Sequence, residues 1–174
     1  MALPIILYGS TVLRKHCFEV KEEDNLKEIS DELFDTLKKA RGIGLAAPQI
    51  NLLKRIFVID TTPMVKDDVS IEQFEGVYLN PEILDYEKDS VTYTEGCLSI
   101  PDIFEEVKRP DKIYVRYQDI SLKTHEEELD GIIARIFQHE YDHLEGILFI
   151  DRMNLLKRKL IAGKLNNIKR SSIT

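Results

Sequence analysis

The stretch Gln138-His-Glu-Tyr-Asp-His-Leu-Glu-Gly146 decides how the rest of the chain is interpreted. Residues four apart on a helix lie on one face, about one turn apart, so His139 and His143 can hold one metal ion. Glu140 stands beside the first histidine and can exchange a proton with water at that metal. This is the HExxH pattern of metal-dependent hydrolases. The alternative is a surface helix with two spare histidines, because three fixed residues also match by chance.

The residues around this stretch predict a buried helix. Apolar residues recur at spacings of three and four, which is the helical period; they are Leu129, Ile132, Ile133, Ile136 and Leu144. Gly146 follows soon after His143 and suits the end of a helix. We therefore expect the face with the histidines to point inward, where a glutamate beside a metal is more often functional than not.

Two histidines do not complete a catalytic metal site, which needs three protein ligands and one open position. One known solution is a third histidine six residues beyond the second, but Phe149 stands there. Cys97, in the stretch Glu95-Gly-Cys-Leu-Ser99, is a candidate because a thiolate is a strong ligand for zinc or ferrous iron. The alternative is that Cys97 is a small buried hydrophobic residue, as most free cysteines are.

The length and composition predict one soluble globular domain that spans residues 1–174. Hydrophobic residues make up 43% of the chain and charged residues 32%, which is ordinary for such domains. No apolar run approaches the length that spans a membrane, and the short apolar start lacks the cationic flank of a signal peptide. The two cysteines, Cys17 and Cys97, are therefore expected to be reduced thiols in the cytoplasm.

The end of the chain is basic, although the net charge is −7. Residues 152–174 contain seven Lys or Arg and no Asp or Glu. We predict a basic C-terminal helix at about residues 152–170, with one apolar side made of Leu155, Leu156, Leu160 and Leu165. It suggests a polyanionic partner, and we expect the ribosome rather than DNA or a membrane. The alternative is a solvated helix whose cationic end suits the helix dipole.

Two glycines, two alanines and a proline between Gly42 and Gln49 predict a tight loop that lets backbone approach another group closely. The Gly-Lys-Ser/Thr ending of a phosphate-binding loop is missing. Taken alone, the loop is best interpreted as the end of a helix followed by a turn. The alternative is a loop that cradles a substrate and points the Gln49 amide at a reacting carbonyl.

The remaining patterns predict strands and one further helix. A helix is expected to begin at Asp24 or Asn25 and to end at Gly42. The expected strands are residues 55–60, 77–79 and 82–88 around an Asn80-Pro81 turn, a hairpin of 103–107 and 112–117, and a further strand at 121–128. Residues 61–76 are polar and acidic and predict a surface excursion.

Three of these stretches together resemble the signature motifs of the peptide deformylase family. Residues 42–49 match glycine-x-glycine-Leu-Ala-Ala-x-Gln, residues 95–99 match Glu-Gly-Cys-Leu-Ser, and residues 138–146 match Gln-His-Glu-x-Asp-His-Leu-x-Gly. They occur in the family's order, and no motif residue departs from the pattern. The resemblance implies an α+β fold in which antiparallel sheets pack around the central HExxH helix, with a C-terminal helix.

The resemblance also implies an activity: removal of the formyl group from N-formyl-methionyl nascent peptides, with release of formate. It implies that Cys97, His139 and His143 hold one divalent metal ion, with Fe²⁺ expected and Zn²⁺ or Ni²⁺ as substitutes. Glu140 is then the general acid and base, and Gln49 with the backbone N–H of Leu98 clamps the oxyanion. The methionine side chain needs an apolar pocket near the metal, for which the candidates are Ile43, Gly44 and Ile136. Arg135 lies near the same helix face, and its direction stays open.

Two other classes of protein share some of these features. A zinc peptidase also uses HExxH, but Phe149 and a cysteine ligand disfavour that class. A non-catalytic protein that binds the ribosome or RNA would explain the basic tail. Structural zinc sites, however, usually have four ligands and need no acid or base.

Overall fold

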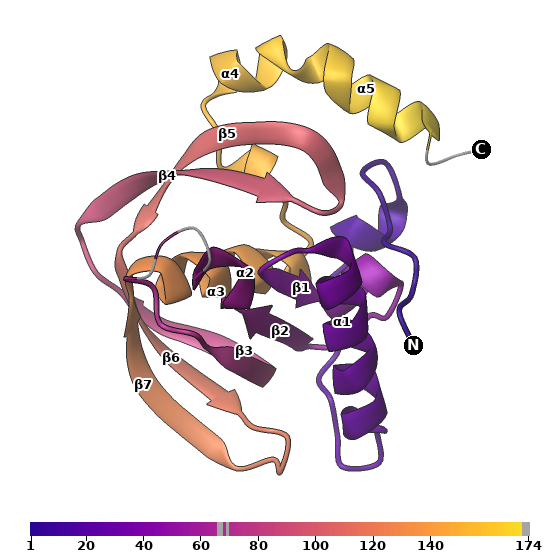
Figure 1. The fold of residues 1–174 in the computed structure, drawn as a ribbon. Helices are drawn as coiled ribbons and strands as arrows, with labels where there is room; N and C mark the ends of the chain where they lie inside the picture. The colour runs from indigo at the N-terminus through magenta and orange to yellow at the C-terminus, as the bar shows by residue number, and fades with distance from the viewer. Residues whose placement is uncertain (66–67, 69, 172–174) are drawn as a thin grey trace.

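Helix α3 (Gly131–Leu144) carries the HExxH residues and lies at the centre of the molecule, as Figure 1 shows for the computed structural model. The structure describes residues 1–65, 68 and 70–171. The middle of α3 is buried from Ala134 to Gln138, so the predicted buried helix is confirmed. The chain leaves α3 through Gly146, whose φ of +72° is one that residues with a Cβ rarely adopt.

A five-stranded sheet with antiparallel neighbours supports α3, in the order β1-β2-β3-β6-β7. Its strands are β1 (Gly44–Ala46), β2 (Ile56–Asp60), β3 (Glu75–Tyr86), β6 (Lys112–Gln118) and β7 (Thr124–Asp130). A separate antiparallel hairpin consists of β4 (Ser90–Cys97) and β5 (Ile100–Pro110). The predicted fold class, antiparallel sheets around a central helix, is confirmed.

Strand β2 is buried on both faces because a helix covers each side of it. Phe57 and Ile59 belong to the apolar cluster under α3, whereas Ile56 and Val58 belong to the cluster under helix α1 (Leu26–Ala40). Successive side chains of a strand point to opposite faces, which explains why all five residues of β2 are buried. The predicted strand at 55–60 is confirmed.

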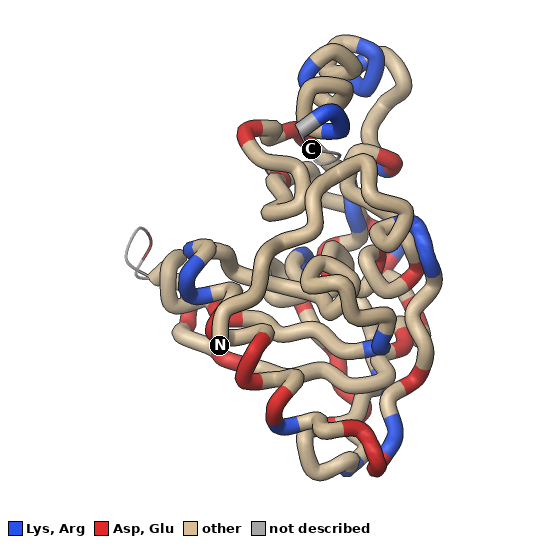
Figure 2. The backbone as a smooth tube through the Cα atoms, turned by 90° about the vertical axis from the view of Figure 1, so that its right-hand side faces the viewer, with Lys and Arg blue, Asp and Glu red and all other residues tan. Residues whose placement is uncertain are grey.

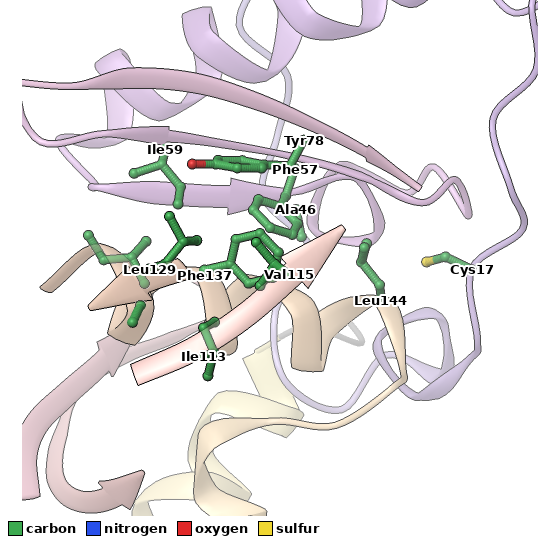
Figure 3. Close-up of a cluster of buried hydrophobic side chains, with 12 residues drawn as sticks. Cys17, Ala46, Phe57, Ile59, Tyr78, Ile113, Val115, Leu129, Phe137 and Leu144 are labelled. Carbon is green, nitrogen blue, oxygen red and sulfur yellow. The ribbon is translucent and has the colours of Figure 1, made fainter. Parts of the chain in front are cut away.

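Three aromatic rings fix the register of α3 on the sheet. Phe137 of α3 meets Phe57 and Tyr78 edge to face, with ring centroids 5.0 Å and 5.1 Å away (Figure 3). Such pairs are favourable beyond the area they bury. Phe137 is two residues before His139, so this packing also fixes the direction of the histidine face.

The C-terminal segment forms two helices rather than the single one predicted at about 152–170. They are α4 (Leu155–Leu160) and α5 (Ala162–Ser171), and α4 ends at Ile161, whose side chain is buried. The 3-10 helix η3 (Phe149–Asp151) precedes them. The predicted apolar side is also wrong in part: Leu165 is buried, but Leu155, Leu156 and Leu160 are exposed. The reason is that the chain bends at Ile161 to reach the apolar cluster under β5.

The predicted hairpin of residues 103–107 and 112–117 is wrong. Strand β5 pairs with β4, and β6 pairs with β3 and β7, so the two segments lie in different sheets. Alternating apolar residues predict that a segment is a strand, but they do not name its partner. The turn at Pro110 serves to carry the chain from one sheet to the other.

The predicted turn at Asn80-Pro81 is an irregularity inside one continuous strand, β3. Asn80 has a φ of +47°, and the register with β6 shifts between Leu79 and Glu82. The Asn80 amide accepts a hydrogen bond from Val20 N and donates one to Gln118 Oε1, both at 2.8 Å. These bonds hold the bulge without ending the strand.

The remaining expected helix and strand form with shifted ends; the strand expected at 121–128 is β7, which covers Thr124–Asp130. Helix α1 follows Asn25 and ends at Ala40, and its C-cap residue Arg41, with a left-handed φ of +56°, comes one residue before the predicted Gly42. The expected excursion at 61–76 contains helix α2 (Thr62–Val65); its residues 66, 67 and 69 lie outside the described residues. Within the described part of the chain, no helix has the length and apolar character needed to span a membrane.

Candidate metal centre and active site

Three side chains that can bind a metal gather where the end of β4 meets α3. One ligand atom each from Cys97, His139 and His143 lies within 4.8 Å of the other two, and Cys97 Sγ is 3.3 Å from His143 Nε2. One thiolate and two imidazoles suit zinc or ferrous iron and leave a position open for water. The residues present therefore fit a single divalent metal ion.

Phe149 occupies the position at which another class of HExxH protein has its third histidine. The side chain is buried, and its ring stacks on His139 with centroids 6.0 Å apart. It therefore packs against a candidate ligand instead of supplying one.

Glu95 orients the first histidine. Its Oε2 lies 3.0 Å from His139 Nδ1, and both side chains are largely buried. A hydrogen bond at Nδ1 fixes the imidazole tautomer and leaves Nε2 for the metal. Burial alone would raise the pKa of Glu95, but the hydrogen bonds from His139 and Arg109 lower it well below its usual range. Glu95 is therefore an ionised carboxylate.

A buried arginine, Arg109, links Glu95 on β4 to Asp142 near the C-terminal end of α3. Arg109 donates to both oxygens of Glu95, at 2.7 Å and 3.0 Å, and to Asp142 Oδ2 at 2.7 Å. Asp142 also accepts from Arg152 at 2.6 Å. Neither Arg109 nor Asp142 is predicted from the sequence, although the HExxH spacing places Asp142 on a buried helix, where a carboxylate requires a cation.

Arg135, whose direction is open in the sequence, turns inward. It is 4% exposed and donates to Glu95 Oε1 and to the carbonyl oxygens of Val91 and Val107. Its guanidinium also lies 5.0 Å from the centre of the Tyr93 ring. Arg135 thus ties both strands of the β4–β5 hairpin to α3, and with them the strand end that carries Cys97.

Glu140 directly follows the candidate ligand His139 in the sequence, and one of its carboxylate oxygens makes no hydrogen bond within the described part of the chain. Its Oε2 is buried and has no hydrogen-bond partner among the described residues. Burial raises the pKa of Glu140 to about 7, a value suited to a group that both takes and gives a proton near neutral pH.

The Gly42–Gln49 segment folds back toward the metal centre. It forms β1 and the 3-10 helix η2 (Ala47–Ile50), and Gln49 is buried. The Gln49 Oε1 accepts from Ala46 N at 2.9 Å, while Nε2 lies 3.1 Å from Ser99 Oγ and 3.6 Å from Cys97 Sγ. The segment is therefore more than the helix end and turn favoured from the sequence alone. Leu98 directly follows Cys97, in the turn between β4 and β5.

One cavity of about 800 Å³ opens onto these groups. Its walls include Cys97, Leu98, His139, Glu140 and Gln49, and the predicted pocket residues Ile43, Gly44 and Ile136 also line it. Pockets of about 300–1,000 Å³ hold drug-sized ligands. The cavity can therefore take a ligand larger than one formyl-methionyl residue.

The backbone at Gly44 lies close to the Glu140 carboxylate, and replacing Gly44 by alanine is expected to lower kcat/KM by about 10²-fold. An added Cβ would overlap Glu140 Oε1 and lie 2.9 Å from Ile136 Cγ2, which pushes the carboxylate from its place. The matched control is Gly163→Ala in α5, where a Cβ would meet no atom of the described residues within 4 Å. Formate assays and metal analysis on both variants would check this; equal activity of the two would contradict it.

The fold and the site together define a class of protein: a metal-binding hydrolase built on an HExxH helix, with one cysteine and two histidines as its candidate metal ligands. Comparisons with known proteins agree. The family model for polypeptide deformylase matches residues 2–159. A peptide deformylase from Cytophaga hutchinsonii is 43% identical over 98% of this chain and 92% of its own length. One from Flavobacterium johnsoniae is 44% identical, over 97% of this chain and 90% of its own length.

Solved structures of the same family share the fold. The peptide deformylase of Thermus thermophilus superposes with a TM-score of 0.88 at 38% identity, covering 98% of this chain and 99% of that one. That of Plasmodium falciparum gives 0.87 at 39% identity, covering 96% and 95%. The chain belongs to the polypeptide deformylase family, whose members are enzymes that remove the N-formyl group from nascent peptides. The zinc-peptidase and non-catalytic alternatives are therefore wrong.

Proposed function

We propose that this chain deformylates N-formyl-methionyl peptides at one ferrous ion held by Cys97, His139 and His143. The observation that carries the assignment of residues is a buried oxygen of Glu140 that has no hydrogen-bond partner in the described part of the chain and lies beside this candidate ligand set, inside one cavity. A divalent metal ion bound there would supply a Lewis acid that lowers the pKa of water. The thiolate favours Fe²⁺ or Zn²⁺ over harder cations, and Zn²⁺ or Ni²⁺ would substitute for Fe²⁺.

The proton is handled by Glu140. Its carboxylate takes a proton from the attacking water as the new bond to the formyl carbon forms. It then gives the proton to the amine nitrogen as the carbon–nitrogen bond breaks, which yields formate and a free N-terminus. Burial raises the pKa of Glu140, which favours the step in which Glu140 holds the proton between its two transfers.

The oxygen that becomes negative during the reaction is stabilised by two donors in this proposal. One is the Nε2 of Gln49, whose other amide atom is fixed by Ala46 N. The other is the backbone N–H of Leu98. A fixed donor of this kind lowers a barrier by about 3–4 kcal/mol.

The methionine side chain lies, in this proposal, against Ile43, Gly44 and Ile136. All three line the cavity, and Ile136 stands one helical turn before His139. Apolar contact close to the metal site would hold the formyl carbon next to Glu140.

The direct test is formate release from formyl-Met-Ala-Ser by protein purified without oxygen and loaded in turn with Fe²⁺, Ni²⁺ or Zn²⁺. We expect formate with the highest rate for Fe²⁺, and one bound metal ion per chain. A Cys97→Ser variant should lose most of its bound metal. Formate from none of the three loaded forms would contradict the proposal.

The ribosome is the proposed partner of the C-terminal helices, and we place the enzyme in the cytoplasm, where nascent chains emerge. Lys and Arg gather on α4 and α5 (Figure 2), and Lys159, Lys164 and Arg170 are exposed. The positive surface suits the phosphates of ribosomal RNA. Leu155, Leu156 and Leu160 are exposed beside these cations and add apolar contact area.

Reversing two of these charges is expected to weaken ribosome binding by at least about tenfold at 0.1 M salt. The change is Lys159→Glu with Lys164→Glu, and the control is Lys88→Glu with Lys123→Glu, two exposed lysines outside the tail. Removing the whole tail is a poorer test, because Leu165 and Ile161 pack into the cluster under β5. Co-sedimentation with ribosomes measures binding, and formate release should stay unchanged. Equal binding by both double variants would contradict the prediction.

A further inference from the structure

Phe104 is a solvent-exposed apolar side chain that lines the proposed substrate cavity. Its neighbours along β5, Ile103 and Val107, are buried, whereas Phe104 is 69% exposed. Single exposed apolar residues are common and need no explanation. Phe18, for example, is 70% exposed and is not among the residues that line the cavity. Phe104 differs because it lines the same cavity as Cys97 and Glu140.

The ring of Phe104 lies against the neighbouring strand β4. Phe104 pairs with Gly96 across the β4–β5 hairpin, and Gly96 directly precedes the candidate ligand Cys97. A Cβ on Gly96 would lie 2.6 Å and 2.7 Å from two carbon atoms of the ring. The ring therefore packs directly on the Gly96 backbone, while most of its surface stays exposed.

The cavity is larger than the formyl-methionyl group needs. Ile43, Gly44 and Ile136 account for the methionine side chain, yet the lining continues along the hairpin to Phe104 and Pro101. A peptide whose first residue lies at the metal centre must leave the cavity along its rim. The side chain of one of the next residues would then meet the hairpin.

We propose that Phe104 is a specificity-determining residue that contacts the second or third residue of the substrate and favours an aromatic side chain there. The inference rests on the proposed deformylase reaction. Ring-to-ring contact adds to the burial of apolar area, and the Phe104 ring already packs on the Gly96 backbone on one side. A small or polar side chain at the same place gains neither.

The test compares kcat/KM for formyl-Met-Ala-Ser, formyl-Met-Phe-Ser and formyl-Met-Ala-Phe. We expect the wild type to prefer one of the aromatic peptides by about two- to tenfold. Phe104→Ser should reduce that ratio to near one, and Phe104→Leu should leave an intermediate ratio. Phe18→Ser is the matched control, because it removes an equally exposed ring outside the cavity and should keep the full ratio.

The outcomes separate this inference from the reaction it rests on. If all three peptides release formate but Phe104→Ser keeps the wild-type ratio, Phe104 has no role in specificity while the reaction stands. If the ratio falls equally in Phe104→Ser and Phe18→Ser, the effect is general and the inference is overturned. If no peptide releases formate, both the inference and the proposed function are wrong.

Discussion

Replacing Glu140 by glutamine is expected to lower kcat/KM for formate release by about 10²–10⁴-fold, which is the range that general acid–base catalysis contributes. Glutamine has nearly the shape of glutamate, so it fits beside Gly44 without the overlap that a Cβ there would cause. It cannot take a proton from water. The metal content should stay at the wild-type value, because Glu140 is not among the three candidate ligands.

The matched control for this change is Glu145→Gln at the end of the same helix. Glu145 pairs with Arg55 and His16 on the side away from the cavity lining. Formate release and metal analysis should show near-normal activity for Glu145→Gln and full metal in both variants. A Glu140→Gln enzyme with a third or more of the wild-type rate would rule out Glu140 as the acid and base.

The pH profile of the wild type supplies a second measurement. The pKa of Glu140 is raised to about 7 by burial, and the charge of a bound metal ion lowers it again. The first step needs the carboxylate form, so kcat/KM should fall as the pH drops through that pKa, at or below about 7. A rate that stays level down to pH 4 would contradict this assignment.

The sequence predicts the two candidate histidine ligands because their signal is local. His139 and His143 are four residues apart on one helix, and the apolar period shows which way that face points. Cys97 could be placed with them only through a resemblance, since nothing within residues 95–99 says that they meet α3. Short stretches of sequence thus predict the two histidines of the candidate site, whereas the position of Cys97 beside them depends on tertiary packing.

The strand partners and the buried ion pairs are tertiary properties that local patterns do not contain. The alternation in residues 103–107 predicts a strand, but only the sheet shows that β5 pairs with β4 and not with β6. Arg109 looks like a surface residue before Pro110, and its burial depends on two carboxylates 14 and 33 residues away. The same holds for Arg135, because its buried charge is compensated only by hydrogen bonds to Glu95 and to two backbone carbonyl oxygens.

Arg109→Met is expected to lower the free energy of unfolding by about 3–5 kcal/mol, because it leaves two buried carboxylates without their shared cation. Glu95, Arg109 and Asp142 are each at most 6% exposed. The matched control is Arg116→Met. Arg116 also binds two carboxylates, Glu126 at 2.7 Å and Glu82 at 3.2 Å, but at the surface, where the loss should stay within about 1 kcal/mol.

Urea unfolding of both variants, at equal protein and metal concentrations, measures the difference. If both variants lose the same free energy of unfolding, burial of the Glu95–Arg109–Asp142 network has no energetic effect. A loss limited to Arg109→Met, together with weaker metal binding, would show that the network both stabilises the fold and orients His139 through Glu95.

At acid pH, the difference in the free energy of unfolding between the wild type and Arg109→Met should become smaller. The pKa of Glu95 is lowered in the folded protein from its ordinary 4.5, so the unfolded chain binds more protons in the acid range. The stability that Glu95 gains from Arg109 is fully present above pH 4.5 and is lost progressively as the pH falls below it. Unfolding curves at pH 7 and at pH 4 should therefore show the larger effect of Arg109→Met at pH 7. The reverse order would mean that Arg109 acts through its packing and not through its charge.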